Sequence, residues 1–124
     1  MSKRRSDIYR FTPLLLAIAV TANAGDIDQP AAFSALQESD SVLIDVRTEQ
    51  EFAEGALSGA TRIETGELAE RIDDIAPDKH APIVLYCRSG RRSSAAQDLL
   101  HELGYQRVIN AGAYEDLKTV VQRP

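Results

Sequence analysis

The one cysteine of the sequence stands beside a cluster of three arginines, the densest basic cluster after residue 24. Cys87 is followed directly by Arg88, Ser89, Gly90, Arg91 and Arg92. The thiolate is the reactive form of cysteine, and nearby positive charge stabilises it. Successive backbone N–H groups of a short loop can also point at one centre and hold an anion there. The segment therefore predicts a nucleophilic thiolate with an anionic substrate, rather than a buried cysteine that only packs.

The cysteine also lies between an expected strand and an expected helix. Residues 82–86 are an apolar run of strand length, and residues 95–103 carry apolar side chains at helical spacing. The first turn of a helix offers free N–H groups and the positive end of its dipole, and Gly90 gives the loop backbone freedom. Such a loop would hold a thiolate and equally the terminal sulfur of a persulfide, which is also anionic. Ser93 and Ser94 are expected to cap the helix.

Further strands and helices alternate along the chain. Residues 42–46 and 107–109 are expected strands. Thr48 and Glu51 have the spacing of a capping box, which predicts a short helix that ends at Gly55. Three more helices are expected over residues 28–36, 65–75 and 114–121.

This alternation predicts an α/β fold of three layers, with a small, mostly parallel central sheet and helices on both faces. Active sites in such sheets lie at the carboxyl ends of the strands. Cys87 follows one buried strand, and Asp45 and Arg47 end another, so the three residues should share one edge. We interpret Asp45 and Arg47 as structural supports of that edge.

Four ordered segments resemble the rhodanese family. Residues 87–93, which read C-R-S-G-R-R-S, are similar to its active-site loop, and residues 43–47 resemble its strand motif ending in D-V-R. Residues 51–60 resemble its E-[FY]-x-x-G-H-I-x-G-A segment, although Ala56 replaces the usual histidine. Residues 110–113 resemble its N-x-G-G turn, with Ala113 in place of the second glycine. The resemblance spans nearly all of residues 30–121 and implies a rhodanese-like fold.

The resemblance also implies an activity, that of a thiosulfate sulfurtransferase. Cys87 would attack the sulfane sulfur of a small anionic donor such as thiosulfate, sulfite would leave, and the cysteine would carry a persulfide. Cyanide, a thiol or a protein would then accept the sulfur. No metal and no organic cofactor is implied.

The loop after Cys87 is the implied binding site for the donor, formed by Arg88, Ser89, Gly90, Arg91 and Arg92. Arg88 and Arg91 are the side chains expected nearest its open side. Arg92 opens the following helix, and two roles remain open for it. It either binds the substrate or braces the loop against Asp45 or Glu51.

Other classes of protein fit the sequence less well. Cysteine phosphatases and arsenate reductases carry arginine six positions after the cysteine, where this chain has Ser93, and Arg92 falls one position earlier. A thioredoxin-like enzyme needs a second cysteine. His80 and His101 are far from Cys87 in the sequence, so a metal site is not expected. A non-catalytic rhodanese module, used for protein binding or sulfur sensing, typically loses the cysteine or the loop glycine, and both are present here.

The amino-terminal residues predict export. A basic segment at residues 3–10 precedes an apolar run at residues 14–20 and the A-x-A sequence of residues 22–24. The apolar run is shorter than the roughly 20 residues that a membrane span needs. We expect a signal peptide over residues 1–24, a short linker over 25–29 and one rhodanese domain over 30–124. This organisation is similar to that of small periplasmic rhodaneses, including the phage-shock type.

The net charge restricts the partners. The chain has 14 basic and 19 acidic residues, and residues 1–24 contain 4 and 1 of these, which leaves 10 and 18, or −8. Nucleic acid and anionic membranes would repel such a protein. We therefore expect no nucleic-acid partner and no stable membrane association after cleavage. Together with the predicted export, we expect a periplasmic monomer.

Overall fold

The computed structural model describes residues 26–121. The signal peptide expected over residues 1–24 and its cleavage site lie outside the described residues. Over residues 26–121, no helix has both the length and the apolar composition to cross a membrane.

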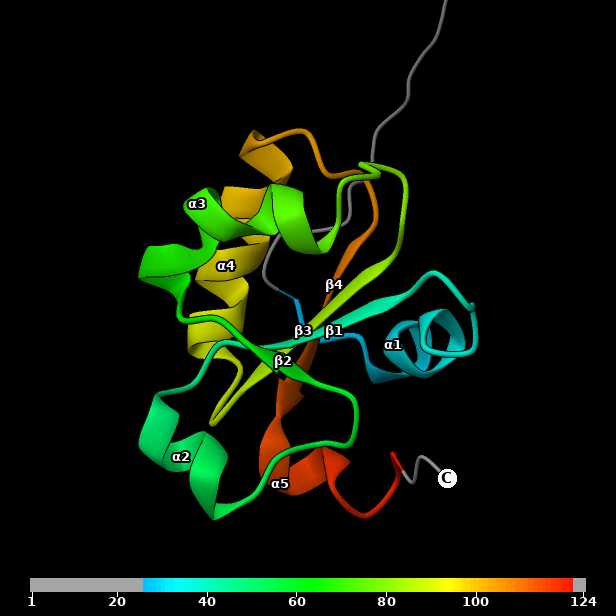
Figure 1. The fold of residues 1–124 in the computed structure, drawn as a ribbon. Helices are drawn as coiled ribbons and strands as arrows, with labels where there is room; N and C mark the ends of the chain where they lie inside the picture. The colour runs from blue at the N-terminus through cyan, green and yellow to red at the C-terminus, as the bar shows by residue number, and fades with distance from the viewer. Residues whose placement is uncertain (1–25, 122–124) are drawn as a thin grey trace, which may run out of the picture.

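Four parallel strands form one sheet in the order β2-β1-β3-β4 (Figure 1). Their bounds are β1 (Val42–Asp45), β2 (Thr61–Arg62), β3 (Ile83–Cys87) and β4 (Val108–Ala113). The central strands β1 and β3 are continuous apolar runs because helices cover both of their faces. Asp45 pairs with Tyr86, so both strands end at the same edge of the sheet. The expected α/β fold with a parallel sheet is confirmed.

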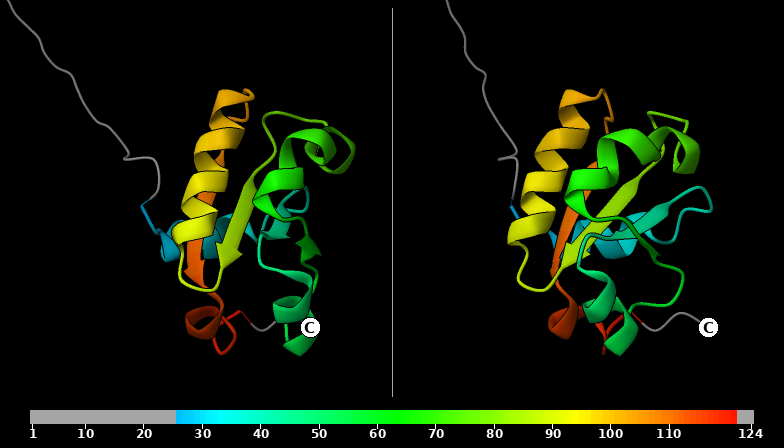
Figure 2. Two further views of the ribbon diagram at one scale, coloured as in Figure 1. Left: turned by 90° about the vertical axis from the view of Figure 1, so that its left-hand side faces the viewer. Right: turned by 60° about the vertical axis from the view of Figure 1, so that its left-hand side comes forward.

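Five helices complete the described part of the chain: α1 (Gln29–Ala35), α2 (Glu49–Glu54), α3 (Thr65–Ile75), α4 (Arg91–Glu102) and α5 (Tyr114–Leu117). The helices α3 and α4 lie on one side of the sheet and α1 on the other (Figures 1 and 2). The short helices α2 and α5 lie beyond the carboxyl ends of the strands. The helices α2 and α5 therefore lie next to the edge of the sheet where the active site was expected.

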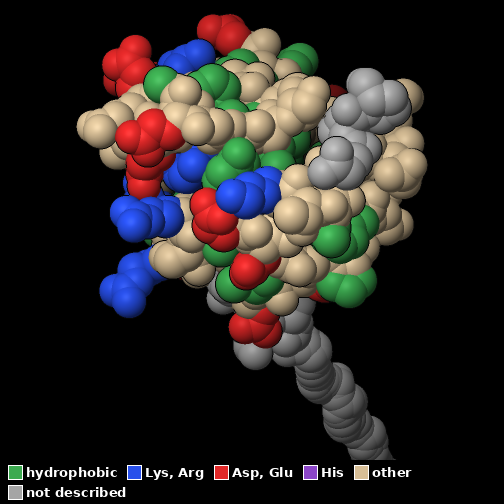
Figure 3. Space-filling model, turned by 90° about the horizontal axis from the view of Figure 1, so that it is seen from below, with side chains coloured by type: hydrophobic (Ala, Val, Ile, Leu, Met, Phe, Trp, Pro, Cys, Tyr) green, Lys and Arg blue, Asp and Glu red, His purple; other side chains and the backbone are tan. Residues whose placement is uncertain are grey.

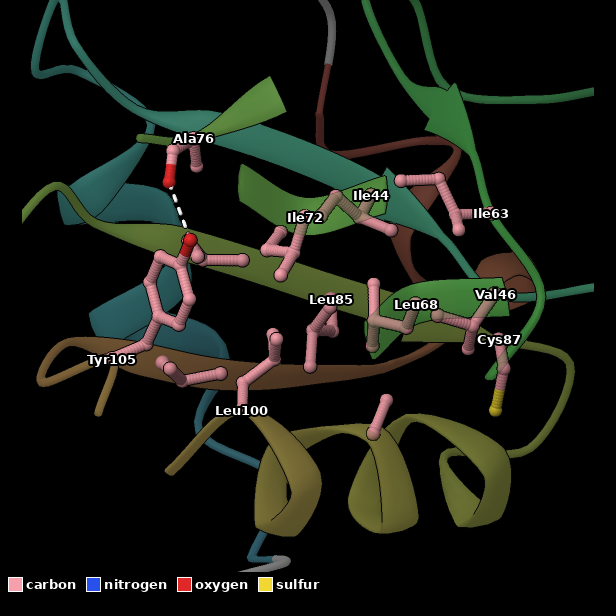
Figure 4. Packing of buried hydrophobic residues seen from close by; sticks show 13 residues of the cluster. Ile44, Val46, Ile63, Leu68, Ile72, Ala76, Leu85, Cys87, Leu100 and Tyr105 are labelled. Atoms are coloured by element: carbon pink, nitrogen blue, oxygen red, sulfur yellow. Dashed lines mark hydrogen bonds between the residues drawn. The ribbon is translucent and has the colours of Figure 1, made fainter. Parts of the chain in front are cut away.

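Side chains of β3 alternate between two hydrophobic cores. Ile83, Leu85 and Cys87 pack in the core beneath α3 and α4, whereas Val84 and Tyr86 pack in the core beneath α1. Figure 4 shows the first core, with Cys87 at one end and its sulfur directed toward α4. Because successive side chains of a strand point to opposite faces of the sheet, the thiol of Cys87 lies on the face that α4 covers.

The expectation for α4 needs correction. The helix begins at Arg91, and its N-cap is Gly90 in the left-handed conformation, without a side-chain capping bond. Ser93 and Ser94 therefore lie inside the helix and do not cap it. The buried face of α4 consists of Ser93, Ala96, Gln97 and Leu100, whereas Ala95 and Leu103, two of the apolar residues within 95–103, are exposed.

The two ends of the domain also differ from expectation. Within residues 25–29, which were expected to be a linker, Ile27 forms a β-bridge with Asn110. Asp28 accepts a hydrogen bond from Ala31 N at 3.1 Å and caps α1, where the start of this helix was expected. Strand β4 continues beyond residue 109 to Ala113. It does so because a register shift opposite Leu85 and Tyr86 accommodates an extra residue. The last helix ends at Leu117 and not at residue 121.

Candidate active site

The thiol lies where a strand meets a helix. Cys87 is the last residue of β3, and a loop of Arg88, Ser89 and Gly90 leads into the first turn of α4. The side chain has no exposed surface. The sequence-based expectation for the position of Cys87 and its loop is thus met by the geometry.

Donors from the loop and from α4 surround the sulfur. Gly90 donates its backbone N–H to Cys87 Sγ at 2.9 Å, and Ser93 Oγ lies 3.5 Å from the same sulfur. Burial alone would raise the pKa of the Cys87 thiol. The hydrogen bonds from the Ser93 side chain and from the backbone of Ser93, Ser89 and Gly90 outweigh burial, so the pKa lies below the ordinary value of a thiol. The loop favours a thiolate.

The backbone of Gly90 makes this loop possible. Its φ angle is 95°, in the left-handed region that residues with a side chain rarely adopt. A Cβ atom at this position would lie 2.8 Å from Ile27 Cδ1 and 3.4 Å from Gly112 Cα. The positive φ angle therefore favours glycine, and a Cβ atom would also have to displace the end of the Ile27 side chain.

Asn110 of β4 connects the loop to the sheet. Its Nδ2 donates to Gly90 O at 3.1 Å, and its Oδ1 accepts from Ser93 Oγ at 2.7 Å and from Gly112 N at 3.0 Å. The residue is fully buried. Sequence reasoning placed Asn110 in a family motif but did not place it at the site. The sequence did contain one signal for this role, because the amide of Asn110 directly follows the short apolar strand expected over residues 107–109.

The three arginines of the loop differ in their surroundings. Arg88 and Arg91 are exposed, and their side chains form no ion pair within residues 26–121. Arg92 instead binds both carboxylate oxygens of Glu51, with its nitrogens 2.9 and 3.0 Å from Oε1 and Oε2. Of the two roles considered for Arg92, the geometry matches the brace, and its partner is Glu51 rather than Asp45. The Arg92 guanidinium lowers the pKa of Glu51 to about 2.

Asp45 and Arg47 form a buried pair at the end of β1. The Arg47 Nη2 atom lies 2.7 Å from Asp45 Oδ2 and donates to Gly55 O at 2.6 Å. The guanidinium also lies over the ring of Tyr114, 4.4 Å from its centre. Arg47 thus connects β1 with the end of α2 and the beginning of α5. The supporting role of Asp45 and Arg47 stays a prediction.

A cavity of about 440 Å³ opens beside the loop, between α2 and α5. Its walls carry both signs of charge and are formed by Arg47, Glu51, Glu54, Gly55, Arg88, Tyr114, Glu115 and Lys118. Figure 3 looks onto this end of the molecule and shows acidic and basic side chains side by side. Among residues 26–121, no group of three or more His, Cys, Asp or Glu side chains has the arrangement of a metal site.

Comparison with known proteins identifies the family. Residues 29–118 match the model of the rhodanese-like domain. Thiosulfate sulfurtransferase PspE of Escherichia coli K12 is 39% identical over 74 residues, which cover 60% of this chain and 71% of that protein. The protein named Sulfurtransferase of Allochromatium vinosum is 35% identical over 86 residues, covering 68% and 78%.

Solved structures agree with the sequence relatives. A rhodanese with anions from E. coli is 38% identical and superposes with a TM-score of 0.60, covering 61% of this chain and 89% of that one. The human single-domain sulfurtransferase TSTD1 is 26% identical with a TM-score of 0.62, covering 81% and 100%. The chain therefore belongs to the rhodanese-like domain family, and its class of enzyme is sulfurtransferase.

Proposed function

We propose that the protein moves sulfane sulfur from thiosulfate, or a related anionic donor, to cyanide, a thiol or a protein through a persulfide on Cys87. The observation that carries this proposal is the environment of the thiol, whose pKa is lowered by donors from Ser93, Ser89 and Gly90. The name of the E. coli relative, a thiosulfate sulfurtransferase, supports thiosulfate as the donor.

In the first half of the reaction, the Cys87 thiolate attacks the outer sulfur of thiosulfate. The S–S bond of the donor breaks, and sulfite leaves with the electron pair. The exposed guanidinium groups of Arg88 and Arg91 attract the donor anion, and the donors around the loop then bind the negative terminal sulfur of the persulfide. Arg92 holds the loop in place through Glu51.

In the second half, an acceptor attacks that terminal sulfur. The bond between the two sulfurs breaks, its electron pair returns to Cys87 Sγ, and the thiolate is ready for another donor. The Gly90 N–H that binds Cys87 Sγ stabilises the thiolate as it is restored. Both steps use residues of this chain alone.

We further propose that residues 1–24 direct export to the periplasm and that the domain acts there as a monomer. The basic and apolar segments before the A-x-A sequence support export. We also propose that the domain begins before residue 30, because Ile27 and Asp28 contact β4 and α1.

The decisive experiment is intact mass spectrometry of the protein after incubation with thiosulfate. Formation of the covalent intermediate predicts a gain of about 32 Da, one sulfur atom, which cyanide removes as thiocyanate. The Cys87→Ser variant should show no gain. A folded protein with a free thiol that gains no sulfur from thiosulfate or from other sulfane donors would disprove the proposal and favour the non-catalytic module.

A further inference from the structure

The cavity between α2 and α5 is larger than the small anions of the proposed reaction require. Its volume is about 440 Å³, whereas a water molecule takes up only about 30 Å³ of the liquid. Cyanide has two atoms and thiosulfate has five. Arg88 lines the cavity and follows Cys87 directly in the chain, so a molecule bound there lies next to the loop that carries the thiol. The cavity thus has room for an acceptor of several more atoms.

Most charged groups of the cavity already have a partner of opposite charge. This is true of Arg47, Glu51, Lys118 and Glu115. Glu54, in the last turn of α2, and Arg88, in the loop, are both exposed and have no ion pair or side-chain hydrogen bond within residues 26–121. The cavity therefore offers one uncommitted carboxylate and one uncommitted guanidinium to a ligand.

We propose that this cavity binds the sulfur acceptor, and that it selects a thiol with both a free ammonium and a free carboxylate, as in an amino acid. Glu54 receives the ammonium group and Arg88 the carboxylate. The inference rests on the proposed function, because an acceptor site has a use only when Cys87 carries a persulfide. Arg88 serves the donor and the acceptor in turn, since sulfite has left before the acceptor reacts.

The transfer balances without any further reactant. The acceptor thiolate attacks the terminal sulfur and forms a new S–S bond, while the bond from that sulfur to Cys87 Sγ breaks. The electron pair of the broken bond stays on Sγ. A persulfide anion and a thiolate become a thiolate and the persulfide anion of the acceptor, so total charge is unchanged.

The test compares four thiols as acceptors from the persulfide form of the full enzyme, prepared with thiosulfate. Cysteine carries both charges, cysteamine only the ammonium, 3-mercaptopropionate only the carboxylate, and 2-mercaptoethanol neither. The rate of persulfide loss is measured by mass spectrometry at equal thiolate concentrations and corrected for thiolate basicity. We expect cysteine to react fastest, with each charge contributing about two- to five-fold, the range of exposed ion pairs.

The Glu54→Gln variant should lower the rates with cysteine and cysteamine about two- to five-fold. It should not lower the rates with 3-mercaptopropionate and cyanide, which have no ammonium group for Glu54 to bind. Glu49→Gln is the matched control, because Glu49 lies on the same helix but does not line the cavity. This control should react with all four thiols as the unsubstituted enzyme does.

The possible failures can be told apart. If no persulfide forms, the proposed function itself is wrong. If the persulfide forms and cyanide removes it, but the four thiols differ only as their basicity predicts, the selective acceptor site is wrong and the sulfurtransferase activity stands. Equal corrected rates for cysteine and cysteamine would also overturn the inference, because the carboxylate would then play no part.

Discussion

Ser93 has one hydroxyl proton and two neighbours that can accept it. Its Oγ lies 2.7 Å from Asn110 Oδ1 and 3.5 Å from Cys87 Sγ. Once the thiol loses its proton, the sulfur becomes the stronger acceptor and the hydroxyl can turn toward it. Asn110 Oδ1 then keeps the hydrogen bond from Gly112 N. Ser93 thus stabilises the thiolate more than the thiol, in agreement with the lowered pKa of Cys87.

Ser93→Ala should therefore raise the pKa of Cys87 and slow its alkylation at neutral pH. Loss of one hydrogen bond to a charged group, about 1.4 kcal/mol, corresponds to roughly a ten-fold weaker acid, so alkylation with iodoacetamide should slow most at pH values below the pKa of the thiol. Thiolate is present above the pKa of Cys87 and is lost as the pH falls through it, so the acid limb of the rate profile should move to higher pH.

Ser94→Ala is the control for this measurement, because Ser94 is the next residue of α4 and forms no hydrogen bond with the sulfur through its side chain. It should leave the profile in place. An unchanged profile in Ser93→Ala would show that the backbone donors alone set the pKa.

The helices α2 and α4 are joined by the pair of Glu51 and Arg92. Arg92 lowers the pKa of Glu51 from 4.5 to about 2. The pair therefore contributes fully to stability above pH 4.5, and this contribution is lost as the pH falls through about 2. Both side chains are partly exposed, so the contribution is that of a screened surface pair.

Glu51→Gln should lower the free energy of unfolding by up to about 1 kcal/mol at pH 7, and the difference should disappear below about pH 2. Glutamine can replace glutamate in the capping box, so the variant isolates the contribution of Arg92. Urea unfolding at several pH values measures the effect, with Glu49→Gln as the control. A difference that does not depend on pH would assign the loss to the helix cap.

Alanine substitutions at two glycines can distinguish the cost of backbone strain from the cost of a steric clash behind the active-site loop. Gly90 and Gly59 both have positive φ angles, 95° and 85°, but a Cβ atom meets Ile27 at Gly90 and nothing within 4 Å at Gly59. Gly59→Ala should cost about 1 kcal/mol of stability and leave sulfur transfer unchanged. Gly90→Ala should lower stability further and also lower the rate of persulfide formation. Equal stability and activity of the two variants would contradict the proposed packing behind the loop.

The elements differed in how much the sequence revealed. Continuous apolar runs identified β1 and β3, and the Thr48–Glu51 capping box identified α2, because these signals are local. The N-cap of α4 was missed because it is a left-handed glycine, while serine is the usual sign of a helix start. The extension of β4 was missed because the bulge interrupts the strand pattern.

The sequence predicted the contiguous part of the active site but not the contacts between residues that are far apart in the chain. Cys87 and its loop could be found because they are contiguous in the sequence. The contact of Ser93 with Asn110 spans 17 residues and that of Arg92 with Glu51 spans 41. Contacts of this kind depend on the order of the strands and the crossing of the helices, which no local pattern contains.

At the scale of the whole molecule, the amino-terminal segment completes the domain. Ile27 pairs with Asn110, Asp28 N donates to Asn110 O at 2.9 Å, and Gln29 donates to Ala111 O at 3.2 Å. All three contacts reach β4 next to the loop. The segment that follows the expected signal peptide therefore stabilises the same strand that positions Asn110.

Removal of residues 1–24 should leave a stable, active enzyme, whereas removal of residues 1–29 should lower the free energy of unfolding by about 1–3 kcal/mol. The longer deletion loses the helix cap and the hydrogen bonds to β4. Urea unfolding and persulfide formation of the two shortened proteins provide the measurement. Identical curves would show that the amino-terminal segment contributes nothing to the domain.

The single bridge at Ile27 also has a mechanical consequence. A force that pulls the amino end away from the domain would peel this residue first, because one bridge holds it, whereas ladders of hydrogen bonds join the four strands. The Ile27 side chain lies against Gly90 and Gly112, so peeling would uncover the back of the loop while the sheet stays intact. A chain held under tension at its amino end would then expose Gly90 and Gly112 to solvent before its sheet opens.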